Sequence, residues 1–539
     1  MCAITNLNRE PEVPYPDLVD PQLAIIAPAL HVVQSGRSAL LLYIFICFRK
    51  HADTLTQSAA TVEGTGNSAP IADLIAVGAC FEGPLGKPSS PMRSGLGFPM
   101  ILVGSQLLAG TGMLCANDWP SFRGKNGDGI GTGSLPIRWD VKSGDNVLWK
   151  SPVEGLSISS PIVFEDRVYV TTAVGTDPDP EFKPDPTWGY RILRETDEQE
   201  WKILCLDAKS GRRLWERTAY RGQPKQGRHS ESTYANPTPA TDGTNLVTMF
   251  GSQGLYCHSL DGVLRWKKDL GSLPGAPSDN QKLDWGYSSS PIIHRGEVIV
   301  QCDTPSDGYV AVFDIETGRE RIRIARTGTT TWATPTACRH DGRDILICNG
   351  YRNTAAYDLK TGQELWSLHG RGDIPVPRPV ISGRTVYISS AHGGRSLYAV
   401  DLSATGVLTP DPSDDLPAGL KWWSGRQGSY IPTPLVHEGI VYVANERGMI
   451  TALEADNGAQ IYQSRIVPGR GTMAYASPVL AGGKIYAPNN AGKIYVLKTG
   501  RQFKLLATND MKEQTMATPA ISDGRLFIRT RRHLYCIGR

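Results

Sequence analysis

The chain has 539 residues, and its 56 lysines and arginines nearly balance its 53 aspartates and glutamates, which leaves a net charge of +3. Proteins that bind nucleic acid through its phosphates need an excess or a stripe of basic residues, so the charge balance argues against that class. Apolar residues make up 40% of the chain, which excludes wholesale disorder. The 57 glycines and 38 prolines, together with 20 tyrosines, favour many short strands joined by turns.

The amino-terminal region contains two apolar segments but no sustained strand or helix periodicity over its first 91 residues. Residues 39–48 (ALLLYIFICF) are about half the roughly 20 residues that a membrane-spanning helix needs. Residues 92–116 have the layout of a secretory signal peptide, because a short basic start precedes an apolar run and then small residues. We therefore interpret residues 1–91 as an unassigned extension, with translation beginning at Met92.

From about residue 156 one pattern returns eight times: a Ser/Thr-Pro step, two apolar residues, a Gly/Asp turn and an alternating strand. Seven of the eight prolines follow Ser or Thr, and the exception follows Arg378. A repeat of about 40 to 50 residues with four short strands is typical of propeller blades. The eight prolines are Pro161, Pro239, Pro291, Pro335, Pro379, Pro434, Pro478 and Pro519.

The third strand of several repeats ends in an acidic residue, followed by Gly four positions later and an aromatic residue four positions after that. Asp207, Gly211 and Trp215 form one such set. We expect the glycine to adopt a positive φ in a turn and the aromatic ring to pack between neighbouring blades. Further sets are Asp358, Gly362 and Trp366, and Glu454, Gly458 and Tyr462.

The ten cysteines do not suggest a metal or redox site. None is adjacent to another, and no C-x-x-C occurs. Cys205, Cys257 and Cys536 fall at matching strand positions where related repeats carry alanine. We predict that these cysteines are small buried apolar residues.

The last repeat begins at Pro519 and is too short to include an outermost strand. Residues 146–149 (NVLW) stand before the first repeat and can supply that strand. Pairing of the two would close a ring and remove the open sheet edge that invites aggregation. The predicted fold is therefore an all-β, eight-bladed β-propeller over residues 117–539, closed by an N-terminal strand and preceded by an irregular extension.

The Asp–Gly–Trp arrangement with Ser/Thr-Pro starts resembles the PQQ-like, or quinoprotein-like, β-propeller repeat family over essentially all of 117–539. Residues 119–124 (WPSFRG) and 234–239 (YANPTP) are similar to an exported bacterial branch of that family. For the family's dehydrogenases, the resemblance implies pyrroloquinoline quinone (PQQ) beside Ca²⁺ on the axis, with a carboxylate as general base. The family is also similar to the propeller subunit of the outer-membrane β-barrel assembly machinery, for which the resemblance implies protein partners and no cofactor.

Two departures from the dehydrogenase pattern are visible in the chain. The adjacent cysteines that many of those enzymes carry are missing, and no acidic pair can be assigned from spacing. Asp284, Asp303 and the pair Asn489-Asn490 lie near inter-strand turns, where we interpret them as solvated loop residues. The sequence therefore favours the cofactor-free branch.

Aromatic and basic residues precede the blade prolines and form the candidate binding site. Because propeller strands begin near the axis, these side chains can gather at one mouth of the channel and hold a flat anionic ligand, a sugar or a peptide loop. The alternative is that they pack between blades and cap loops. The candidate cofactor-binding set is Tyr234, Tyr287, Trp332, Arg378, Tyr430 and Tyr475, with Arg228, His229 and Arg470 adding positive charge.

An insertion at residues 175–201 lengthens the first repeat and holds eight acidic residues. It lacks the spacing of a calcium loop, so no metal site is predicted, and we interpret it as a solvated excursion over one face that docks partners.

The predicted function is that of an exported, monomeric propeller of the periplasm or cell envelope that binds a protein partner or a small ligand, with no cofactor expected. Any contact with a membrane would be made through the signal segment or a lipid on Cys115. The alternative is an alcohol or sugar oxidoreductase that uses PQQ with Ca²⁺. A carbohydrate-active enzyme is a further option, but it is not supported by any pair of acids.

Overall fold

The structure is a computed structural model that describes residues 117–182, 192–276, 283–370, 372–390, 392, 394–467 and 474–539. The chain divides into two compact units, 1–104 and 105–539, and every described residue belongs to the second. The predicted extension at 1–91 and the signal-like segment at 92–116 therefore lie outside the described residues. Among the described residues, no helix has the length and apolar character needed to cross a membrane.

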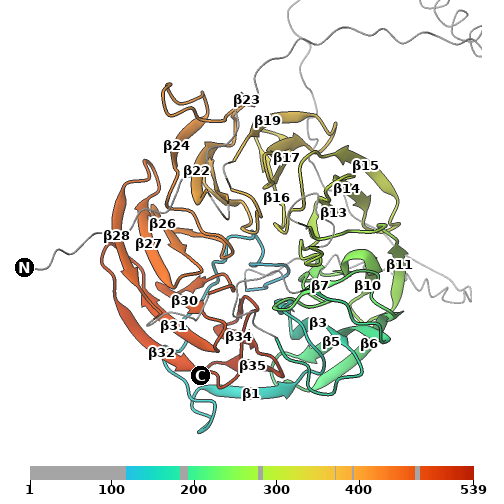
Figure 1. Cartoon of the computed structure of the whole chain (residues 1–539). Helices are drawn as coiled ribbons and strands as arrows, with labels where there is room; N and C mark the ends of the chain where they lie inside the picture. Colours follow the sequence, from blue (N-terminus) through green and yellow to red (C-terminus); the bar gives the residue numbers. More distant parts are fainter. Residues whose placement is uncertain are drawn as a thin grey trace, which may run out of the picture. The chain divides into compact units, whose positions relative to one another are not determined.

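Eight antiparallel sheets follow one another around a ring, as Figure 1 shows. The first four blades, from the inner strand outwards, contain β2 (Ile162–Phe164), β3 (Arg167–Val174), β5 (Gln199–Asp207) and β6 (Arg213–Gly222); β8 (Ala240–Thr241), β9 (Asn245–Met249), β10 (Leu255–Ser259) and β11 (Leu264–Lys268); β12 (Ile292–His294), β13 (Glu297–Cys302), β14 (Tyr309–Asp314) and β15 (Glu320–Ala325); β16 (Thr336–His340), β17 (Arg343–Cys348), β18 (Thr354–Asp358) and β19 (Glu364–Leu368).

The other four blades repeat this order. They contain β20 (Val380–Ser382), β21 (Thr385–Ser390), β22 (Ser396–Asp401) and β24 (Leu420–Ser424); β25 (Leu435–His437), β26 (Ile440–Ala444), β27 (Met449–Glu454) and β28 (Gln460–Arg465); β29 (Val479–Ala481), β30 (Lys484–Pro488), β31 (Lys493–Lys498) and β32 (Leu505–Asp510); β33 (Ala520–Ser522), β34 (Arg525–Arg529), β35 (His533–Ile537) and β1 (Val147–Pro152). The eight-bladed propeller predicted from the sequence is therefore confirmed.

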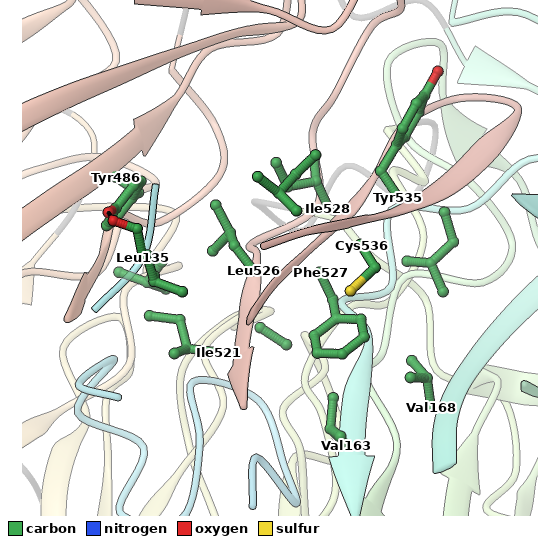
Figure 2. Close-up of a cluster of buried hydrophobic side chains, with 14 of the residues drawn as sticks. Leu135, Val163, Val168, Tyr486, Ile521, Leu526, Phe527, Ile528, Tyr535 and Cys536 are labelled. Carbon is green, nitrogen blue, oxygen red and sulfur yellow. Dashed lines mark hydrogen bonds between the residues drawn. The ribbon is translucent and has the colours of Figure 1, made fainter. Parts of the chain in front are cut away.

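The N-terminal strand closes the ring as predicted. β1 pairs antiparallel with β35, with Trp149 opposite Cys536. The surrounding core joins three blades: Phe527 and Ile528 of blade 8 lie between Val163 and Val168 of blade 1 and Tyr486 of blade 7, as Figure 2 shows. Closure thus depends on side-chain packing as well as on the strand ladder.

The acidic–glycine–aromatic pattern joins successive blades. Trp149 donates from its indole Nε1 to the Ala208 carbonyl of the next blade at 3.0 Å, and a Cβ on Gly211 would stand 2.6 Å from the Trp149 ring. Glycine is therefore required at position 211 for two reasons: its φ is +71°, and the Trp149 indole packs where a Cβ would lie. The same indole-to-carbonyl bond joins Trp215 to Leu260, Trp266 to Ile315 and Trp422 to Ala455.

The Ser/Thr-Pro step also has a structural reason. At six of the eight blade prolines, the hydroxyl of the preceding residue accepts a hydrogen bond from the backbone N–H of the matching residue in the preceding blade, and these bonds form a hydroxyl belt around the axis. The belt contains the bonds Ser160→Thr238, Thr238→Ser290, Ser290→Thr334, Arg378→Thr433, Thr433→Ser477 and Ser477→Thr518, at 2.9 to 3.0 Å.

Two small additions decorate the blades. β23 (Gly406–Val407) pairs in parallel with the outer strand β19 of blade 4. β4 (Ile192–Leu193), in the insertion, pairs with β7 (Arg228–His229), and the described residues contain one short 3₁₀ helix, η1 (Gly251–Gln253). Cys205, Cys257 and Cys536 are fully buried as predicted, and burial raises the pKa of each thiol to about 12.

Candidate functional site

The two faces of the ring differ in the loops that they carry. Because the four strands of a blade alternate in direction, the loops that lead into the inner strands and the turns between second and third strands share one face. We call it the loop face, and the opposite side the turn face. All the predicted site residues precede inner strands and therefore belong to the loop face.

The chain's own residues 118–131, the axial segment, lie against the inner strands, and Figure 1 shows them inside the ring. The Trp119 N–H donates to the Val163 carbonyl of blade 1 at 2.8 Å. On the other side, the Gly131 N–H donates to the Leu480 carbonyl of blade 7 at 2.8 Å. The centre of the ring therefore carries this segment of the chain.

Arg123 fixes the axial segment to two blades. Its side chain is fully buried and donates from Nη1 to the Pro478 carbonyl and from Nη2 to the Pro434 carbonyl, both at 2.8 Å. The two acceptors belong to the blade prolines that the repeat analysis identified. Burial lowers the pKa of Arg123 to about 9, so the guanidinium remains charged near neutral pH.

Arg378, the exception to the Ser/Thr-Pro pattern, holds the same segment from blade 5. It donates from Nη1 to the Phe122 carbonyl at 2.7 Å and from Nε to Thr336 Oγ1 at 2.9 Å. A Cβ on Gly127 would stand 2.2 Å from the guanidinium carbon, so the segment approaches this arginine at a glycine. Burial lowers the pKa of Arg378 to about 10. The Arg378 side chain thus binds the axial segment, and these contacts account for an arginine at this position without a ligand.

Tyr287 and Trp332 are buried structural residues in this ring. The Tyr287 hydroxyl donates to the Gln301 carbonyl at 2.6 Å, and burial raises the pKa of that hydroxyl well above its usual value. The Trp332 indole donates to the Gly286 carbonyl at 2.8 Å. Both arrangements fit the alternative of inter-blade packing and loop capping.

Tyr234 lies in a separate group with Arg228 and an acidic residue of the insertion. The Tyr234 hydroxyl donates to Glu195 Oε2 at 2.6 Å, and Arg228 donates from Nη2 to Glu195 Oε1 at 2.6 Å. The Arg228 guanidinium is also 5.6 Å from the centre of the Tyr234 ring. Arg228 is therefore neutralised by Glu195 and adds no free positive charge at the mouth.

Tyr475 takes part in a contact across the mouth. Its hydroxyl donates to Glu231 Oε2 at 3.0 Å, which joins the loop before blade 7 to the loop before blade 2. Tyr430 packs against His392, with ring centres 5.3 Å apart. That Tyr430 and Tyr475 gather at one mouth stays a prediction.

The hollow between Tyr234 and Tyr287, between blades 1, 2 and 3, has a cavity volume of about 10 Å³. Typical small-molecule sites have about 300–1,000 Å³, so this pocket is below that range. Its other lining residues are Gln226, Thr233, Phe250, Gly251, Gln253 and Gly286. Whether any of the six predicted residues binds a ligand stays a prediction, and Arg470 lies outside the described residues.

The acidic residues near the axis have structural partners. Asp303 forms a buried ion pair with Arg326 at 2.7 Å, and Asp284 accepts the Gly227 N–H at 2.7 Å while it is only 5% exposed. Asn489 is also buried and accepts the Lys493 N–H at 2.8 Å. The interpretation of these three residues as solvated loop residues was wrong, because each supports a turn or a seam.

These positions bear on the fit of PQQ with Ca²⁺. Calcium takes six to eight oxygen ligands, from carboxylates, backbone and side-chain carbonyls and waters. In the part of the chain that the structure describes, no three His, Cys, Asp or Glu side chains come together as metal ligands. Whether PQQ and Ca²⁺ bind stays a prediction of the dehydrogenase resemblance.

The insertion is attached to the propeller at two places, while half of its described residues are exposed, as expected for an excursion over one face. Glu195 pairs with Arg228 as described above, and Asp179 accepts hydrogen bonds from Arg531 at 3.0 Å and from Arg532 at 2.9 Å. It thereby links blade 1 to the turn between the second and third strands of blade 8. Its described part lies on the loop face.

Sequence reasoning missed Arg123 and Glu231 as residues that organise the site. Arg123 lies outside the repeats, so no periodicity marked it. Glu231 reaches across the ring to a residue 244 positions away, a contact that no local pattern contains. The one available signal was Arg378, because it interrupts an otherwise regular Ser/Thr series.

Comparisons with known proteins agree with this architecture. Among solved structures, the quinohemoprotein alcohol dehydrogenase from Comamonas testosteroni matches with a TM-score of 0.52 at 11% identity, covering 78% of this chain and 81% of that one. A europium-containing methanol dehydrogenase matches with a TM-score of 0.51 at 10% identity, covering 77% and 89%. The BamB protein from Moraxella catarrhalis matches with a TM-score of 0.47 at 16% identity, covering 69% and 98%. These likenesses describe the fold alone.

No curated protein sequence matches this chain. A family model does match, over residues 133–281, 202–408 and 418–539, and its description is outer membrane protein assembly factor BamB. These segments include well over half of the chain and coincide with the blades. The chain therefore belongs to this PQQ-like β-propeller family.

Proposed function

We propose that this protein is an exported, protein-binding scaffold of the cell envelope, and that its partner contacts the loop face. The observation that carries the proposal is the occupied axis. Residues 118–131 lie where an axial ligand would enter, and Arg123 and Arg378 hold them there. A ring whose centre carries part of its own chain offers its outer surfaces for recognition.

The loop face is the better candidate of the two faces. Its loops are cross-connected by the Glu231–Tyr475 hydrogen bond and by the insertion, so they form a preorganised surface. Preorganised surfaces lose less conformational entropy on binding. Half-buried Tyr430 and exposed His392 offer aromatic and polar contacts beside that connection. The family's description as an assembly factor is consistent with a partner of this kind.

Site-specific photo-crosslinking in the native envelope tests the proposal. A photoreactive residue at Tyr430 should give a discrete adduct with another protein, while one at exposed Asp523, in a turn of blade 8 on the turn face, should not. Fractionation of the same cells should place the protein in the envelope. Equal adducts from both positions, or adducts from Asp523 alone, would argue against the loop face.

The alternative function is tested separately. Purified protein is mixed with PQQ and Ca²⁺, and quinone absorbance is measured after removal of free cofactor. Retained absorbance together with alcohol- or sugar-dependent dye reduction would overturn the scaffold proposal.

A further inference from the structure

Arg529 is a buried cation whose charge the structure leaves uncompensated. It ends β34 in blade 8 and is 1% exposed. None of its three guanidinium nitrogens has a hydrogen-bond partner among the residues that the structure describes. Burying a charge without a partner is strongly destabilising, so such a group is expected to have one in the folded protein.

The register of blade 8 shows where Arg529 lies. Ala520 pairs with Phe527, and two more residues along the ladder place Arg529 opposite Thr518 of the hydroxyl belt. The same position in the other seven blades is occupied by uncharged residues. They are Thr171, Met249, Gln301, Asn349, Ser389, Ala444 and Pro488.

Equivalent polar residues contact the next blade around the ring. Gln301 donates to the Asn349 carbonyl at 2.7 Å, and Asn349 in turn donates to the Ser389 carbonyl at 2.9 Å. By this equivalence Arg529 belongs to the seam between blades 8 and 1. That seam has no belt hydrogen bond between Thr518 and Ser160 among the described residues, although six others do form.

The acidic group whose charge acts on Arg529 is already engaged. Glu513 raises the pKa of Arg529, although burial outweighs it and brings that pKa to about 10. Glu513 Oε1 is bonded to His533 at 2.6 Å and to Tyr535 at 3.2 Å. Its Oε2 accepts from Thr530 at 2.7 Å and from the Arg532 N–H at 3.2 Å. All four acceptor sites of this carboxylate are thus used by other donors.

We propose that the seam between blades 8 and 1 is a binding site for a small oxyanion, a carboxylate or a phosphate, with Arg529 as its principal ligand-binding residue. A guanidinium presents parallel N–H donors that match two oxygens of such an anion. The neighbouring cations Arg531 and Arg532 pair with Asp179 of the insertion, so Arg529 is the one left to meet the ligand. Arg529 lies at the loop-face end of β34, whereas the crosslinking test of the partner surface uses Tyr430, in the loop before blade 6.

Thermal unfolding of the full chain tests the inference, with inorganic phosphate, acetate and chloride compared at matched ionic strength. The wild-type Tm should rise and then saturate in phosphate or acetate, by on the order of 5 °C at a hundredfold excess over the Kd. R529M should unfold at a higher temperature than wild type in chloride, because it removes the unpaired charge, and should not respond to either oxyanion. R525M, on the same strand, is the matched control and should respond as wild type does.

Calorimetric titration of the wild type gives a second readout that does not depend on any variant folding. One phosphate or acetate per chain is expected, and R529K should weaken it about tenfold or more because an ammonium lacks the paired donors. The anion that binds with the lower Kd shows whether the natural ligand is a phosphate or a carboxylate. An unchanged wild-type Tm in both oxyanions with no binding heat, or an R529M response equal to wild type, would overturn the site. Neither result would affect the crosslinking outcome at Tyr430.

Discussion

Substitution of Gly318 by alanine isolates the contact that joins blade 2 to blade 3. Gly318 has φ +67°, and a Cβ there would stand 2.6 Å from Cδ2 of Trp266. Gly296, in another turn of blade 3, has φ +80° but nothing within 4 Å of its Cβ position. Comparing G318A with G296A therefore separates the cost of backbone strain from the cost of the clash with the Trp266 indole.

The magnitude follows from three contributions. A non-glycine residue in the left-handed region costs about 1–2 kcal/mol, and this applies to both variants. For G318A, overpacking against the Trp266 ring adds about 1–3 kcal/mol. Displacement of that ring also weakens its 2.7 Å hydrogen bond to the Ile315 carbonyl, which contributes about 1 kcal/mol. We expect G318A to lose about 3–6 kcal/mol of unfolding free energy and G296A about 1–2 kcal/mol.

Urea denaturation followed by tryptophan fluorescence measures both variants. The effect of removing glycine from the unfolded chain is the same in each and cancels in the comparison. In the double variant G318A/W266A, the G318A effect should fall to that of G296A, because the clashing ring is gone. Equal losses in the two single variants, within about 0.5 kcal/mol, would refute the proposed role of the glycine.

Three further predictions concern closure, the axial segment and pH. W149A should lose about 3–5 kcal/mol of unfolding free energy in the same urea assay, because Trp149 is buried in the closing strand. L148A should change that free energy by less than about 0.5 kcal/mol, because Leu148 is 42% exposed. Similar losses in the two variants would contradict closure by packing. R378M should increase the hydrogen-exchange rate of amides 119–131 by roughly tenfold or more, because the charge-assisted bond that it removes from the Phe122 carbonyl contributes about 1.5–3 kcal/mol. The control is R384M, at an exposed arginine, which should leave that rate unchanged. Burial, with a smaller effect of Arg217, lowers the pKa of His258 to about 4, so the unfolded state takes up a proton first and stability falls between about pH 6.5 and pH 4. H258Q should remove about 3 kcal/mol of this fall in stability, measured as the difference in unfolding free energy between pH 7 and pH 4. An unchanged pH dependence would show that His258 is not responsible.

The sequence by itself determined the ring. The eight blade prolines, the acidic–glycine–aromatic sets and the strand at 146–149 are local or periodic features, and each repeat presents them again. Their structural reasons are the hydroxyl belt and the indole-to-carbonyl bonds, which recur from seam to seam. A pattern that is repeated along a chain can be read from one chain, because the same physical requirement selects the same residue types several times.

Only the tertiary structure decided what lies inside and across that ring. The axial segment, the Glu231–Tyr475 contact and the engagement of Arg378 with Phe122 each join residues more than 200 positions apart. Burial likewise separated Tyr287 and Trp332, whose polar atoms meet backbone carbonyls, from half-buried Tyr430 and Tyr475. Each of these contacts occurs once, so it leaves no repeated pattern in the sequence from which it could be predicted. They depend on how far each side chain reaches after eight sheets have been packed around one axis.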